Sequence, residues 1–138
     1  MFDHCLYFNT TALARVLERE WTRAFKPFGL TPSQAFMLRA VLARPGLLQS
    51  ELARELVISR PTATRSLDGL QKLALIDRRA TGGDGRECAV FPEPQALTMH
   101  ADLDAASGAV TARLKQILEP EQFAAIVGSL KQARAAVV

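Results

Sequence analysis

The segment SRPTATRSL, residues 59–67, is typical of a helix whose outer face contacts something other than solvent. Ser59 suits the position that caps the free amides of a first helical turn, and Pro61 is tolerated near a helix start. Small apolar residues recur at steps of four, three and four, which predicts a narrow inward stripe of Ala63, Leu67, Leu70 and Ala74. The other face carries Arg60, Thr62, Thr64, Arg65, Ser66, Asp68 and Lys72. Hydroxyl side chains lower helix propensity, so this face calls for a functional explanation.

Two shorter helices are predicted upstream of this segment. The run TPSQ, residues 31–34, has the pattern of a threonine N-cap, a proline at the first helical position and a glutamine that closes a capping box. We expect this helix to run to about Arg44, where Pro45 and Gly46 end it. A brief third helix follows at residues 49–55, before the segment that begins at Ser59.

A small β-hairpin is predicted downstream. Residues 76–80 and 87–91 each have the composition of a short strand, and the glycine-rich residues 81–86 between them supply the backbone angles of a tight turn. Three helices followed by such a hairpin form a winged helix-turn-helix, whose third helix enters a DNA major groove. Short hydroxyls approach phosphates and base edges closely, and arginine donates two hydrogen bonds to guanine. The surface of residues 59–72 is therefore explained by DNA contact.

The two ends of the chain are predicted to be helical, which makes the fold mainly α with a small β-wing. Apolar residues recur at helical spacing from about Thr10 to Lys26, and again in two segments separated by Glu119 and Pro120. Pro92 and Pro94 are expected to tilt the helix that follows them. The three terminal helices are amphipathic.

Composition places the 138 residues in one globular domain, because 49% of them are hydrophobic and 22% are charged. The apolar runs are shorter than the roughly 18 residues of a membrane span, and the N-terminus does not resemble a signal peptide, so we expect a cytoplasmic protein with no membrane partner. The net charge is only +3, but 13 of the 17 basic residues are arginine, which is suited to bidentate phosphate contacts.

Catalysis and metal binding are not indicated. Cys5 and Cys88 belong to no metal-binding spacing, and the loop at residues 82–85 lacks the lysine and hydroxyl of a phosphate-binding loop. No paired catalytic carboxylates or nucleophile elbow are present. We therefore expect a protein that is not an enzyme and has neither cofactor nor metal.

Three stretches together resemble the MarR family of bacterial transcription regulators across about residues 30–97. They are LTPSQAFMLRAV, SELARELVISRPTATRSLDGLQKLALIDRR and DGRECAV. The opening HCLYFN also resembles a subgroup whose first helix begins with a cysteine-rich segment. The sequence departs from the family pattern in three places: Leu48 replaces a capping threonine, the wing is one residue longer, and FPEP at residues 91–94 replaces the usual junction after the wing.

The resemblance implies a homodimer that binds double-stranded DNA. Residues 1–30 and 93–138 would form a dimerisation region, and residues 31–92 the winged helix-turn-helix. Two copies of the third helix would then bind inverted half-sites about one helical turn, roughly 34–36 Å, apart. In the family, a wing arginine enters the minor groove while an aspartate braces it. The DNA-contacting residues carried over are Ser59, Arg60, Thr62, Thr64, Arg65, Asp84 and Arg86.

The resemblance also suggests regulation by a ligand, since many relatives bind a small aromatic anion between the dimer region and the DNA-binding region. The candidate pocket consists of Arg15, Arg19, Trp21, Phe25 and Phe36. A hydrophobic core and a solvated helix face explain the same residues. The favoured function is a repressor that a small aromatic or phenolic effector releases from its operator.

Two alternatives remain open from the sequence. Cys5 could make the protein a thiol-based redox-sensing regulator, although a reactive thiol needs a lowered pKa and solvent access, and a cysteine buried at an interface explains Cys5 as well. The second alternative is a winged-helix module that binds proteins and has lost its affinity for DNA.

Overall fold

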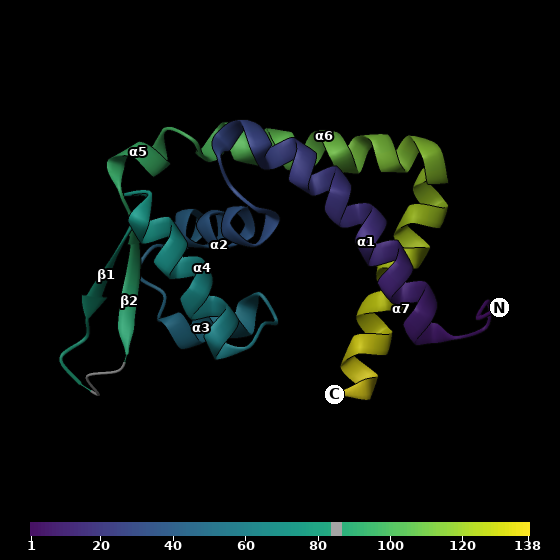
Figure 1. The fold of residues 1–138 in the computed structure, drawn as a ribbon, viewed down its shortest axis with the longest axis horizontal. Helices are drawn as coiled ribbons and strands as arrows, with labels where there is room; N and C mark the ends of the chain where they lie inside the picture. Colours follow the sequence, from purple (N-terminus) through teal and green to yellow (C-terminus); the bar gives the residue numbers. More distant parts are fainter. Residues whose placement is uncertain (84–86) are drawn as a thin grey trace.

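A computed structural model describes residues 1–83 and 87–138, and it confirms a mainly helical fold with a two-stranded wing (Figure 1). The helices are α1 (Leu6–Phe25), α2 (Pro32–Ala43), α3 (Gln49–Glu55), α4 (Arg60–Lys72), α5 (Pro94–Leu97), α6 (His100–Leu118) and α7 (Pro120–Val137), with a 3-10 turn η1 (Lys26–Phe28). The strands are β1 (Ile76–Ala80) and β2 (Cys88–Pro92). We call α2, α3, α4 and the two strands the head, and α1, α6 and α7 the arms.

Local capping signals in the sequence determine where the head helices begin. The Thr31 side chain accepts a hydrogen bond from the Gln34 amide, and the Gln34 side chain accepts one from the Thr31 amide, so the predicted capping box is present. Leu48 has no side-chain acceptor. Glu51 alone caps the start of α3, because its carboxylate accepts a hydrogen bond of 3.2 Å from the Leu48 amide.

The wing pairs as the sequence predicts. β1 and β2 are antiparallel, with Ile76 opposite Pro92 and Arg78 opposite Val90. Val90 also exchanges backbone hydrogen bonds with the loop before α3, donating to the Leu47 carbonyl at 2.9 Å and accepting from the Gly46 amide at 2.8 Å. The wing is therefore anchored to the helix-turn-helix at its base.

The head packs around the inner face of α4. Ala63, Leu67 and Leu70 are buried as the apolar stripe predicts, whereas Ala74 lies beyond the helix, is exposed and has a φ of 60°. Ser66, which we placed on the outer face, is buried with 7% of its surface exposed. Its spacing explains the error, because it lies three residues after Ala63 on the same side of the helix. The other large buried side chains of the head include Met37, Leu38, Val41, Leu52 and Val90.

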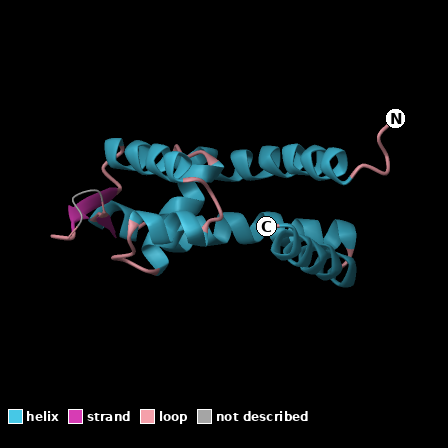
Figure 2. Cartoon of the chain, turned by 90° about the horizontal axis from the view of Figure 1, so that it is seen from below, coloured by secondary structure: helices cyan, strands magenta, loops and turns pink. Residues whose placement is uncertain are grey.

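The arms extend away from the head (Figure 1). Helix α1 packs on α6, where the Trp21 indole donates a hydrogen bond of 3.0 Å to the Ser107 hydroxyl and Arg113 pairs with Glu20. Helix α7 turns away at Glu119, whose φ is 65°, and none of its residues is buried. Figure 2 shows α1 and α7 in separate layers although they overlap in Figure 1. The apolar face of α7 is therefore not covered by the rest of this chain.

The boundaries at both ends differ from the prediction. Helix α1 begins at Leu6 rather than near Thr10, because the Cys5 side chain caps its first turn by accepting a hydrogen bond from the Phe8 amide. After the wing, the short helix α5 was not expected. Pro94 occupies its first turn, where the missing amide proton has no cost. Pro94 therefore starts a separate short helix before α6, whereas Pro92 is the last residue of β2.

The close approach of α4 to α2 predicts that two glycine substitutions differ in their effect on the free energy of unfolding. A Cβ atom at Gly69 would lie 2.5 Å from the Gln34 side-chain nitrogen, so Gly69→Ala requires the end of the Gln34 side chain to move, and we expect this to weaken its hydrogen bond with the Thr31 amide. Gly108 in α6 has open space, and Gly108→Ala should raise the free energy of unfolding by up to about 1 kcal/mol. We expect the Gly69 variant to be at least about 1 kcal/mol less stable than the Gly108 variant in denaturant unfolding. Equal stabilisation by both would contradict this packing.

Candidate nucleic-acid interface

The outer face of α4 is held in place from its first turn. Ser59 caps the helix, because its hydroxyl accepts a hydrogen bond of 3.3 Å from the Thr62 amide and donates one of 2.9 Å to the Thr62 hydroxyl. Thr62 is half-buried by this contact. The helix start therefore presents ordered hydroxyls and backbone amides, which are groups that bind phosphate oxygens.

Free cations lie along the exposed part of α4. Arg60, Thr64 and Arg65 are exposed, and neither arginine forms an ion pair with any described residue. Asp68 is exposed on the same helix but is paired with Arg78 at 2.6 Å. The outer face therefore offers unpaired guanidinium groups whose attraction for an anion is not cancelled locally.

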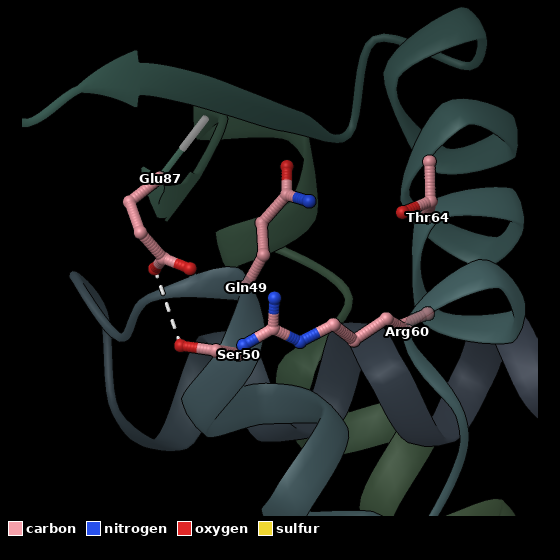
Figure 3. Close-up of a pocket in the computed structure, with 6 residues that line it drawn as sticks. Gln49, Ser50, Arg60, Thr64 and Glu87 are labelled. Carbon is pink, nitrogen blue, oxygen red and sulfur yellow. Dashed lines mark hydrogen bonds between the residues drawn. The ribbon is translucent and has the colours of Figure 1, made fainter. Parts of the chain in front are cut away.

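A polar groove of about 190 Å³ separates α4 from the start of α3 (Figure 3). Arg60 reaches from α4 across this groove toward Gln49 and Ser50. On its far side, the Ser50 hydroxyl donates a hydrogen bond of 3.2 Å to the Glu87 carboxylate. The groove is lined by Gln49, Ser50, Arg60, Ala63, Thr64 and Glu87. It brings amide, hydroxyl and guanidinium donors from two helices to one surface.

A second groove, of about 240 Å³, lies on the other side of α4, toward the start of α2. Its lining residues are Thr31, Ser33, Gln34, Thr62, Arg65 and Ser66. Thr31 and Ser33 are candidate phosphate contacts that our sequence analysis missed. The signal was present, because small hydroxyl residues at a helix N-terminus are typical of anion binding. Arg65 therefore stands beside a second set of hydroxyl donors.

The two wing residues predicted to contact DNA, Asp84 and Arg86, lie outside the described residues. The chain on either side of them is described up to Gly83 and from Glu87 onward.

The five residues predicted to form an effector pocket lie in three different places. Trp21 and Phe25 face the core, and Phe25 is completely buried. Phe36 meets Phe25 edge-on at 6.0 Å but is 40% exposed on the other side of α2. Arg15 and Arg19 lie on the exposed face of α1. The amphipathic character of α1 therefore places its aromatic and basic residues on different sides of the helix within the single chain.

Phe36 instead lines a groove of about 440 Å³ between α2, α3 and α6. Its apolar surface comes from Phe36, Ala40, Ala43, Leu47 and Leu56, and its polar side chains are Arg39, Arg44, Glu55, His100 and Asp104. The Arg39 guanidinium lies 5.1 Å from the centre of the Phe36 ring and donates a hydrogen bond of 2.8 Å to Asp104. Asp104 also lies 3.4 Å from the His100 ring. The groove therefore combines an aromatic wall with a polar link between head and arms.

The two cysteines are not paired. Cys5, for which burial at an interface was considered, is exposed in this chain, and Cys88 is half-buried on β2. Within residues 1–83 and 87–138, no cluster of three or more potential metal ligands occurs. No helix in this described part has the length and apolar character to cross a bilayer.

Comparison with known proteins gives a consistent result. Residues 28–87 match the model of the MarR family. A MarR protein from Peptoclostridium difficile superposes with a TM-score of 0.86 at 18% identity, over 98% of this chain and 88% of that chain. MepR from S. aureus, solved with DNA, gives 0.85 at 17% identity over 95% and 96%. CouR, solved on a 23-mer DNA duplex, gives 0.81 at 24% identity over 96% and 94%. A search of curated proteins found no significant match.

Proposed function

We propose that the chain is a transcriptional regulator of the MarR type, a homodimeric repressor that binds an inverted-repeat operator through α4. The observation that carries this proposal is the pair of exposed arginines, Arg60 and Arg65, which form no ion pair within residues 1–83 and 87–138 and lie among hydroxyl donors on a capped helix. The DNA complexes of MepR and CouR, which share the fold, support the choice of partner.

The proposed contacts divide into two kinds. Arg60, Thr64 and Arg65 lie where base edges can be reached, whereas Ser59 and Thr62 at the helix start are suited to phosphates. Asp84 and Arg86 are proposed to place the wing arginine in the minor groove. Base contacts determine sequence preference, and phosphate contacts add affinity that falls steeply with salt.

The arms are proposed to form the dimer interface. Exposed large apolar residues gather on them, at Leu6, Tyr7, Leu13, Val16, Ile117, Val127 and Leu130. A twofold dimer that buries these residues would remove apolar area from water and give α7 the partner that it lacks within one chain. It would also present two copies of α4 to the two half-sites of one operator.

An effector is proposed to bind the groove between α2, α3 and α6 rather than the surface of α1. An aromatic acid there would stack on Phe36 and exchange the Arg39–Asp104 pair for its own carboxylate. Because Arg39 belongs to the head and Asp104 to α6, this exchange would favour a different head spacing. An effector shifts the dimer only by its differential affinity for the two arrangements.

Substitution of Arg65 tests the DNA-binding proposal. Arg65→Ala should lower affinity for a duplex selected from a random pool by about 10- to 100-fold, and lower affinity for a scrambled duplex much less. Arg86→Ala should lower both affinities to a similar degree. Arg15→Ala removes a similarly exposed cation from α1 and serves as the control. Equal loss on both duplexes for Arg65→Ala in gel-shift titrations would remove its role in specificity.

The oligomeric state in solution tests whether the arms form a dimer interface. Light scattering should give the mass of a dimer for the natural sequence, and Ile117→Asp or Val127→Asp should weaken association by at least about tenfold because each places a charge in the apolar interface. Gln132→Asp, at an exposed polar position of α7, is the matched control. A monomeric natural protein that still binds operator DNA tightly would contradict the proposal.

Binding of small aromatic acids tests whether the groove between α2, α3 and α6 is an effector site. Benzoate or 4-hydroxybenzoate should raise the melting temperature and weaken binding to the selected duplex, since each acid would stabilise a head spacing unsuited to DNA. Arg39→Ala should abolish both effects, whereas Arg19→Ala should leave them intact. The reverse pattern would return the effector to the α1 surface, and no response in the unsubstituted protein would count against phenolic acids as effectors.

A further inference from the structure

Arg78, in the middle of β1, connects three elements of the head. Its guanidinium donates to the Asp68 carboxylate at 2.6 Å and to the Gln71 side-chain oxygen at 2.7 Å, both on α4. A third, longer contact of 3.5 Å joins it to the Gln49 side chain at the start of α3. Only 20% of the Arg78 side chain is exposed. The planar guanidinium of this wing residue therefore donates hydrogen bonds to both α3 and α4, the two helices of the helix-turn-helix.

Asp68 makes this contact significant for DNA binding. It lies on α4 one turn after Arg65 and is about half exposed, at 51% of its side chain. An unpaired carboxylate at this position would repel the phosphate backbone that approaches the same helix. Arg78 neutralises the Asp68 carboxylate, and this ion pair attaches β1 of the wing to α4.

The neighbouring arginine shows that this arrangement is specific to position 78. Arg79 is 61% exposed, pairs with Asp77 on its own strand at 3.0 Å and lies 4.1 Å from the centre of the Phe91 ring in the wing. None of these contacts reaches α3 or α4. Arg79 therefore has the same charge on the same strand without a link to the recognition helix.

We propose that Arg78 is a positioning residue that fixes the wing to α4 and neutralises Asp68, so that helix and wing approach DNA as one unit. This inference rests on the proposed DNA-binding function. Losing Arg78 has two consequences: the wing is released from α4, and an uncompensated carboxylate remains beside the phosphates. The second consequence depends on Asp68, which makes the proposal testable by a double-mutant cycle.

The cycle compares Arg78→Met, Asp68→Asn and the double variant, with Arg79→Met as the matched control. The probes are the duplex selected from a random pool and a scrambled duplex of equal length, at one fixed salt concentration. Arg78→Met should lower affinity for the selected duplex at least about tenfold, and Arg79→Met less than about threefold. In the Asp68→Asn background, Arg78→Met should cost less than about threefold, because no carboxylate remains unpaired. An equal cost in both backgrounds would mean that Arg78 acts without Asp68 and would overturn the proposal.

Amide hydrogen exchange tests the same link without DNA. Arg78→Met should speed exchange in the last turn of α4 and in β1 and β2 together, whereas Arg79→Met should leave α4 unchanged. Unchanged exchange in α4 for Arg78→Met would overturn the positioning role. If the unsubstituted protein binds no duplex, the proposed function fails, and this measurement still decides whether Arg78 links wing and helix. Arg78→Lys keeps the charge but not the planar fork, so it should give intermediate effects and replaces the methionine variant if that does not fold.

Discussion

The packing of the inner face of α4 against α2 and the wing is the constraint on which the rest of the head depends. Leu67 and Leu70 are completely buried, and this burial fixes the rotation of the helix about its axis. Because that rotation is fixed, Arg60 and Arg65 point outward with no acidic partner among the described residues. The exposed chemistry of α4 is thus a consequence of what its other side must bury.

Head and arms obtain their stability in different ways. The core of the head closes on the base of the wing through Val90 and continues into α1 and α6 through Phe25 and Leu103, whereas α7 has no buried residue in the single chain. The link between the two regions includes few polar contacts, of which Arg39 with Asp104 is one. If the proposed dimer forms, the distance between its two heads can change while the fold of each head is kept.

Features that depend on neighbouring residues were predictable from the sequence, and features that depend on distant ones were not. The Thr31 capping box and the Ser59 cap arise from side chains three residues apart, and the wing strands pair across one glycine-rich turn. The contact from Arg78 to α4 and α3 joins residues up to 29 positions apart, which periodicity cannot reveal. The relative placement of the basic and aromatic residues of α1 likewise depends on how the helix packs against distant parts of the chain.

Gln34 performs two tasks in the head, since its side-chain oxygen caps the start of α2 and its nitrogen occupies the space beside Gly69. Positions 34 and 69 are consequently not free to change one at a time. A larger residue at position 69 requires the end of the Gln34 side chain to move, and this movement weakens the cap on α2. The residues at positions 34 and 69 should therefore change together among related sequences, because both depend on the spacing between α2 and α4.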